Sequence, residues 1–75
     1  MLTSVEHAAQ DILHKGTTYR IISEDLTILH PDQVIVAVFD VSVPGKAKEV
    51  HRLTGRSEKE IYGLTKQAGK YVDGL

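Results

Sequence analysis

The sequence contains no cysteine and no tryptophan, and it has no long apolar run. Without cysteine the chain has no disulfide, no thiolate nucleophile and no cysteine-ligated zinc or iron–sulfur centre. The longest apolar run, Val34–Phe39, is far below the ~18–20 residues of a membrane span. Residues 1–15 lack the basic and apolar regions of a signal peptide. These absences predict a cytoplasmic protein without a membrane segment, a cofactor or a metal site.

Net charge is also small, at −1 from nine Lys and Arg against ten Asp and Glu. A generic nucleic-acid binder is usually basic overall. The charge is unevenly placed, however: residues 1–43 carry two cationic and six acidic side chains, whereas residues 44–75 carry seven and four. The 75 residues allow one small domain over 1–75, whose core should supply no more than about 3–5 kcal/mol of net stability.

The first segment has the pattern of an amphipathic helix. Thr3 and Glu6 have the spacing of a capping box, and Gly16 is a residue type that ends helices in a left-handed conformation. These signals predict a helix over Thr3–His14. Its apolar stripe would contain residues at helical spacing: Val5, Ala8, Ala9, Ile12 and Leu13.

The following segment is rich in strand-forming residues. Thr17–Ile22 predicts a strand, Glu24–Asp25 a turn, and Leu26–Leu29 a short second strand. A helical alternative stays open, because four apolar side chains also lie at helical spacing: Tyr19, Ile22, Leu26 and Leu29.

The middle of the chain gives the strongest strand signal. Val34–Val43 is dominated by valine, whose stiff side chain favours a strand over a helix. Val43–Lys46 has Pro and Gly at the two central positions of a type II turn. Ala47–Thr54 fits either a strand or a helix, although a tight turn after a strand favours a hairpin partner.

The last segment predicts a second helix. Ser57 and Glu60 form a second capping box, and the helix would extend to about Val72. Gly63 and Gly69 should weaken it by roughly 0.5–1 kcal/mol each relative to alanine. Their presence suggests close packing at these two positions.

These elements predict an α+β fold of order α-β-β-(β)-β-α, with two helices on one face of a three- or four-stranded antiparallel sheet. The predicted strand in the middle of the chain is apolar on both sides. Val34, Val36 and Val38 are then expected to lie on the face opposite the helices, as an exposed patch. Such a patch usually marks an interface.

A basic cluster is predicted in the second half of the chain. Lys46 and Lys48 follow the predicted turn, and Arg56 and Lys59 flank the start of the last helix. Together with His30 they form a candidate nucleic-acid site, because cationic side chains and a helix N-terminus both bind phosphate. An ordinary solvated surface neutralised by nearby glutamates is the simpler interpretation.

The element order resembles that of the double-stranded-RNA-binding domain. Gly55–Ile61 looks like the entry into the last helix of that family, and His30 looks like the histidine of its first inter-strand loop. The resemblance implies that Glu6 and Gln10 touch one minor groove of duplex RNA. It also implies that His30 enters the next minor groove while Arg56 and Lys59 meet the phosphates between them.

Catalytic and metal-binding patterns are weak. His7, Asp11 and His14 would share one face of the first predicted helix, but no fourth ligand accompanies them. No local pattern pairs a nucleophile with a base. We therefore predict a non-enzymatic interaction protein, homodimeric or bound to another protein, with duplex RNA or another nucleic acid as the alternative ligand.

Overall fold

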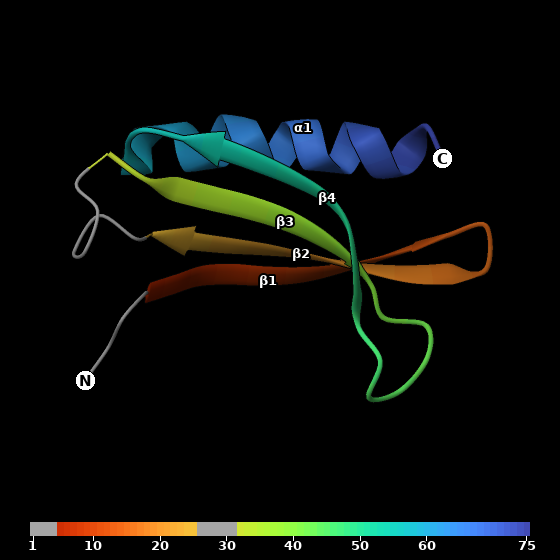
Figure 1. Ribbon diagram of the computed structural model, residues 1–75. Helices are drawn as coiled ribbons and strands as arrows, with labels where there is room; N and C mark the ends of the chain where they lie inside the picture. The colour runs from red at the N-terminus through yellow and green to blue at the C-terminus, as the bar shows by residue number, and fades with distance from the viewer. Residues whose placement is uncertain (1–4, 26–31) are drawn as a thin grey trace.

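Four strands follow one another along the chain and lie in the same order, β1-β2-β3-β4, in one antiparallel sheet (Figure 1). The computed structural model describes the backbone of residues 5–25 and 32–75, and the side chains of residues 9–25 and 32–75. The elements are β1 (Val5–His14), β2 (Thr17–Asp25), β3 (Val34–Asp40), β4 (Lys48–Gly55), a 3-10 turn η1 (Glu58–Glu60) and one helix, α1 (Ile61–Asp73).

The prediction of two helices is wrong, because the first segment is strand β1 and the only helix of the described residues is at the C-terminal end. The cause is the turn that follows β1. Both Lys15 and Gly16 have positive φ, 52° and 81°, and this pair of values is typical of a type I′ hairpin turn. Gly16 therefore reverses the chain within a hairpin, and His14 pairs with Thr17 across it.

Several strand predictions also change. Glu24–Asp25 is the end of β2 and not a turn, while the predicted strand Leu26–Leu29 lies outside the described residues. The prediction of a strand from Val34 is confirmed as far as Asp40. The ambiguity over Ala47–Thr54 is resolved in favour of a strand, since β4 occupies most of that range.

Helix α1 covers one face of the sheet, lying mainly over β2, β3 and β4 (Figure 1). Because side chains alternate along a strand, Val34, Val36 and Val38 all point to this face, where none of the three has any exposed surface. From α1, Ala68 and Val72 are also fully buried. The core is therefore a single layer between sheet and helix, completed by Ile21 and Ile61.

A β-bulge adapts β4 to this core. The register shifts between Val38 and Phe39, so that Val38 pairs with His51 while Phe39 pairs with Glu49. Val50 is thus an additional residue on β4, and its side chain packs against the core. The His51 ring stacks on the Tyr71 ring of α1 with centroids 4.0 Å apart, and the Tyr71 hydroxyl donates to the Val50 carbonyl at 3.3 Å. The bulge therefore joins β4 to α1.

The capping box at the start of the last helical segment is confirmed. The Glu60 carboxylate accepts hydrogen bonds from the backbone N–H groups of Arg56 and Ser57, the latter at 3.0 Å. These N–H groups hold the pKa of the Glu60 carboxyl below its usual value. The last helical segment therefore begins at the predicted cap, although its first turn is a 3-10 turn.

The second face of the sheet is not covered by any helix of the described residues; we call it the open face (Figure 1). The Cα atoms extend only 15 Å in the thinnest direction, which fits one sheet and one helix layer about 10 Å apart. The register places alternating residues of all four strands on the open face, including Asp11, Arg20, Ala37, Phe39 and Arg52.

The turn between β1 and β2 generates a stability prediction. A left-handed conformation costs a residue such as Lys15 about 1–2 kcal/mol, and asparagine adopts it more easily. We expect Lys15→Asn to raise the free energy of unfolding by roughly 0.5–1 kcal/mol, measured by urea denaturation. Lys15→Val should have the opposite effect. Equal stability of the two variants would contradict the assigned turn.

Alanine substitutions at Gly55 and Gly69 should change the stability of the fold in opposite directions. A Cβ on Gly55 would lie 2.8 Å from Glu60 Oε2 and 2.9 Å from Leu64 Cδ1, whereas a Cβ on Gly69 or Gly63 meets nothing within 4 Å. The predicted close packing at the two helix glycines is therefore wrong. We expect Gly55→Ala to destabilise the fold by about 1–3 kcal/mol and Gly69→Ala to stabilise it by about 0.5–1 kcal/mol. Thermal unfolding of both variants checks this, and a stabilising Gly55→Ala would contradict it.

Candidate functional site

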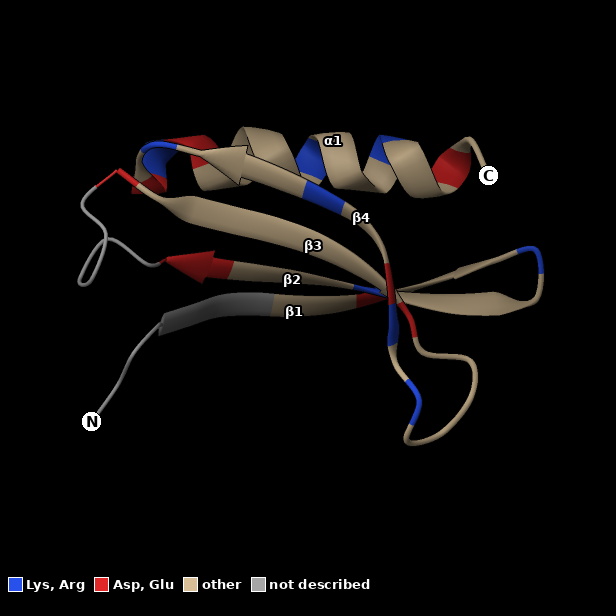
Figure 2. Ribbon diagram, viewed as in Figure 1, with Lys and Arg blue, Asp and Glu red and all other residues tan. Residues whose placement is uncertain are grey.

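The structure separates the basic residues that the sequence groups together. Lys46 and Lys48 lie before and at the start of β4, whereas Arg56 and Lys59 lie beyond its end (Figure 2). Arg56 follows Lys48 by eight positions of extended strand, a distance of about 26 Å. His30 lies outside the described residues. No compact basic patch is formed by the four described residues.

The predicted interface residues are located under the helix. Val34, Val36 and Val38 have no exposed surface and belong to the core between β3 and α1. On the open face, the corresponding β3 positions are Ile35, Ala37 and Phe39. Ala37 is only 5% exposed, and the other two are partly buried. The open face is therefore apolar in the middle but only partly accessible.

Two ion pairs flank this apolar centre. Arg20 on β2 pairs with Asp11 on β1, with its Nε 2.8 Å from Oδ1 and a second contact at 3.1 Å. On the other side, Arg52 contacts Glu49 on β4 at 2.7–2.8 Å. By register, Arg20 and Glu49 are the cross-strand neighbours of Phe39 on its two sides. Charged side chains thus border Phe39, which explains why it is not fully exposed.

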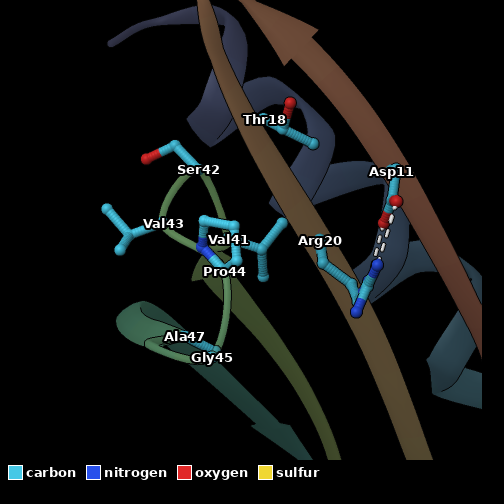
Figure 3. A pocket seen from close by; sticks show the side chains of 9 residues that line it. All are labelled: Asp11, Thr18, Arg20, Val41, Ser42, Val43, Pro44, Gly45 and Ala47. Carbon is cyan, nitrogen blue, oxygen red and sulfur yellow. Dashed lines mark hydrogen bonds and ion pairs between the residues drawn. The ribbon is translucent and has the colours of Figure 1, made fainter.

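A shallow hollow of about 680 Å³ lies at one end of the open face (Figure 3). The paired side chains of Asp11 and Arg20 line one side, with Thr18 beside them, and the loop from Val41 to Ala47 forms the other side. A second hollow continues along β1 and β2 toward Ala9 and again includes Asp11 and Arg20. The two hollows form a trough that follows the outer two strands.

The loop beside the trough has a fixed conformation. Asp40 Oδ1 accepts hydrogen bonds from the Ser42 backbone N–H at 3.0 Å and from the Ser42 hydroxyl at 2.6 Å. These bonds hold the pKa of the Asp40 carboxyl below its usual value. The predicted type II turn is confirmed, because Lys46 N donates to the Val43 carbonyl at 3.1 Å and Gly45 has φ 75°.

The outer edge of β1 is the most exposed apolar part of this region. Leu13 is 74% exposed, more than the other large apolar side chains of the described residues. Among the described strands, β1 has a neighbour on one side only. The sequence could not indicate this edge, because its apolar residues also fit a helix. The only signal was Lys15–Gly16, which fits a two-residue hairpin turn as well as a helix end.

The polar side chains of the region are paired with one another. Ser42 is hydrogen-bonded to Asp40, and neither residue has a histidine among its hydrogen-bond partners in the described residues. Of the weak pattern His7, Asp11 and His14, the His7 side chain lies outside the described residues. Asp11 pairs with Arg20 on the open face, while His14 Nε2 is 3.2 Å from the Leu75 carbonyl oxygen. Among the side chains of residues 9–25 and 32–75, no group of three or more potential metal ligands is found, and no helix of the described residues is long and apolar enough to cross a membrane.

The pair at the centre of the trough gives a titration prediction. A side-chain hydrogen bond from Arg20 holds the pKa of the Asp11 carboxyl below its usual value, so the pair persists until the pH falls through that lowered pKa. We expect Arg20→Gln to raise the Asp11 pKa toward its ordinary value, measured by NMR titration of the carboxyl carbons. Asp40 is the internal control, because Ser42 and not Arg20 lowers its pKa. An unchanged Asp11 midpoint would contradict the prediction.

Comparisons with known proteins add no relative. No family model matches the chain, and neither a curated protein nor a solved structure is significantly similar to it. The resemblance to the double-stranded-RNA-binding domain therefore stays a prediction.

Proposed function

We propose that the protein is a non-enzymatic interaction module that forms a homodimer by antiparallel pairing of β1 with β1 of a second copy. The observation that carries the proposal is the outer edge of β1, which pairs with no other described strand and holds the exposed Leu13 side chain. An edge strand presents unpaired backbone N–H and C=O groups that bind another strand.

The hairpin determines which backbone groups are available. In a two-residue hairpin the residues that flank the turn exchange hydrogen bonds, and bonded and non-bonded pairs then alternate. His14 pairs with Thr17 next to the turn. Counting back along β1, the backbone groups of Leu13, Asp11 and Ala9 point away from β2. These three residues supply the donors and acceptors for a second strand.

The two edges of the sheet differ in their protection. Strand β4 has a bulge at Val50 and charged side chains at Lys48, Glu49 and Arg52. Bulges and charges are common means of preventing edge-to-edge pairing. Strand β1 has its own register shift, between Glu6 and Ala8. From Ala9 to His14, however, it pairs with β2 in regular register and carries one charged residue, Asp11, whose partner is Arg20. Edge pairing is therefore expected at β1 and disfavoured at β4.

Charge also selects the register of the dimer. A register centred on Asp11 would place two carboxylates opposite each other, which is unfavourable. A register centred on Gln10 pairs Ala9 with Asp11 of the second copy through backbone hydrogen bonds and leaves Gln10 at the two-fold axis. Gln10 is exposed, and α1 lies mainly over the other three strands. The result is a continuous eight-stranded sheet with both helices on the same side.

Cysteine substitution tests this register directly, because the chain contains no cysteine. Gln10 would occupy a non-hydrogen-bonded pair at the axis, where the Cβ atoms of an antiparallel pair approach closely enough for a disulfide. We expect Gln10→Cys to form a disulfide-linked dimer under mild oxidation, seen on a non-reducing gel. Thr54→Cys, on the opposite edge strand, is the matched control. Equal cross-linking of both variants would reject pairing through β1.

A second measurement does not depend on oxidation. Size-exclusion chromatography with light scattering should show a dimer of the unmodified chain at high micromolar concentration. Leu13→Lys places a charge on the β1 edge and should yield a monomer with an unchanged circular dichroism spectrum. A strictly monomeric unmodified chain would overturn the proposed function.

Duplex RNA was the alternative ligand, bound through Lys46, Lys48, Arg56 and Lys59 with His30. The separation of the four described residues along β4 removes the local clustering on which that alternative relied. Protein–protein association through the sheet is thus the function that the geometry supports best.

A further inference from the structure

After Leu13, Tyr62 is the most exposed large apolar side chain of the described residues, at 71%. It lies in the first turn of α1, on the side turned away from the sheet, since the buried positions of this helix are Ile61, Ala68 and Val72. Because this tyrosine faces solvent while other positions of α1 pack against the sheet, its ring is not part of the core. Its surroundings therefore indicate what the outer surface of α1 can bind.

Lysines continue the line that Tyr62 begins. Lys66 and Lys70 follow at intervals of four residues, so they lie on the same face at about 6 Å steps along the axis. Lys59 precedes Tyr62 by three residues, in the 3-10 turn. All three lysines are exposed. We call this set (Lys59, Tyr62, Lys66 and Lys70) the basic stripe; its lysines on α1 can be followed in Figure 2.

The tyrosine ring and a lysine of the stripe are in contact. Lys66 Nζ lies 4.7 Å from the centroid of the Tyr62 ring, within the range of a cation–π interaction. The stripe therefore presents a positive charge and a flat aromatic ring together. Side chains of this kind bind nucleotides, because the cation neutralises phosphate and the ring stacks on a base.

Gly63 leaves space beside the ring. Gly63 is exposed, and a Cβ added there would have no atom within 4 Å, so nothing in the described structure requires glycine at this position. A glycine at this position nevertheless weakens a helix by about 0.5–1 kcal/mol relative to alanine. A helix backbone that is bare next to Tyr62 permits close approach of a ligand to the ring.

The acidic side chains of this segment lie outside the stripe's centre. Glu58 and Glu60 are in η1, and the Glu60 carboxylate is bonded to the backbone of Arg56 and Ser57. Asp73 is the last residue of α1. From Ile61 to Val72 the helix carries two lysines and no acidic residue. The central part of α1 is thus cationic although the whole chain has a net charge of −1.

We propose that the basic stripe binds single-stranded nucleic acid, with the lysines on phosphates and Tyr62 stacked on an unpaired base. A duplex would leave Tyr62 without a base to stack on. An anionic membrane is a poorer partner, because an interfacial helix inserts its apolar face and the apolar face of α1 is buried against the sheet. The stripe requires one copy of the chain, so the proposal does not depend on dimerisation.

Fluorescence anisotropy with a short labelled oligouridylate tests the proposal. Binding to three lysines should fall with salt concentration with a logarithmic slope of about −2. Tyr62→Ala should weaken binding about tenfold or more. Lys66→Gln combined with Lys70→Gln should reduce the slope to about −0.7. The matched control is Lys46→Gln combined with Lys48→Gln, which removes the same charge from the far end of β4 and should leave binding nearly unchanged.

Three outcomes would overturn the proposal. The first is no binding at ~50 mM salt; the second is equal loss in the stripe variant and the control variant. The third is tighter binding of a duplex of related sequence, or of vesicles of anionic phospholipid, than of the single strand. Because all the substituted side chains are exposed, we expect each variant to keep its fold, and circular dichroism checks this.

Discussion

The burial of the β3 valines beneath α1 is the interaction on which the rest of the structure depends. Val36 and Val38 meet Ala68 and Val72 in a layer from which water is excluded. Because the described residues supply one helix for one face, this contact closes that side of the sheet and leaves the other side open. The same contact fixes the direction of α1, which turns Tyr62 and the lysines outward. The outward position of the basic stripe therefore follows from this single packed layer.

Much of the second half of the fold could be predicted from the sequence. The valine-rich strand, the Pro44–Gly45 turn, the Ser57 capping box and the helix after it all have local causes, and each is present in the structure. The first half could not be assigned in the same way. Apolar residues in β1 are spaced so that both a helix and a strand bury some of them, and Gly16 can end a helix or complete a hairpin. Pairing with β2 decides between them, and that contact is not local.

The candidate site was harder to predict than the fold, because it depends on distances across the sheet. Lys48 and Arg56 are near each other in sequence, yet an extended strand places them at opposite ends of β4. In α1 the reverse holds, since residues four apart become neighbours. Tyr62 and Lys66 could thus be recognised as a pair from their spacing alone, once a helix was assigned there. What the sequence could not show is that their side of the helix is exposed.

The order of the elements along the chain has a consequence for synthesis. Each strand pairs with the one before it, so the sheet can assemble from hairpins as soon as they are translated. Helix α1, which covers Val34, Val36 and Val38, is made after all four strands. When the four strands have emerged from the ribosome but α1 has not, the nascent chain exposes an apolar, strand-forming surface. Surfaces of this kind aggregate or bind chaperones. The apolar face of the sheet therefore stays exposed until α1 has left the ribosome.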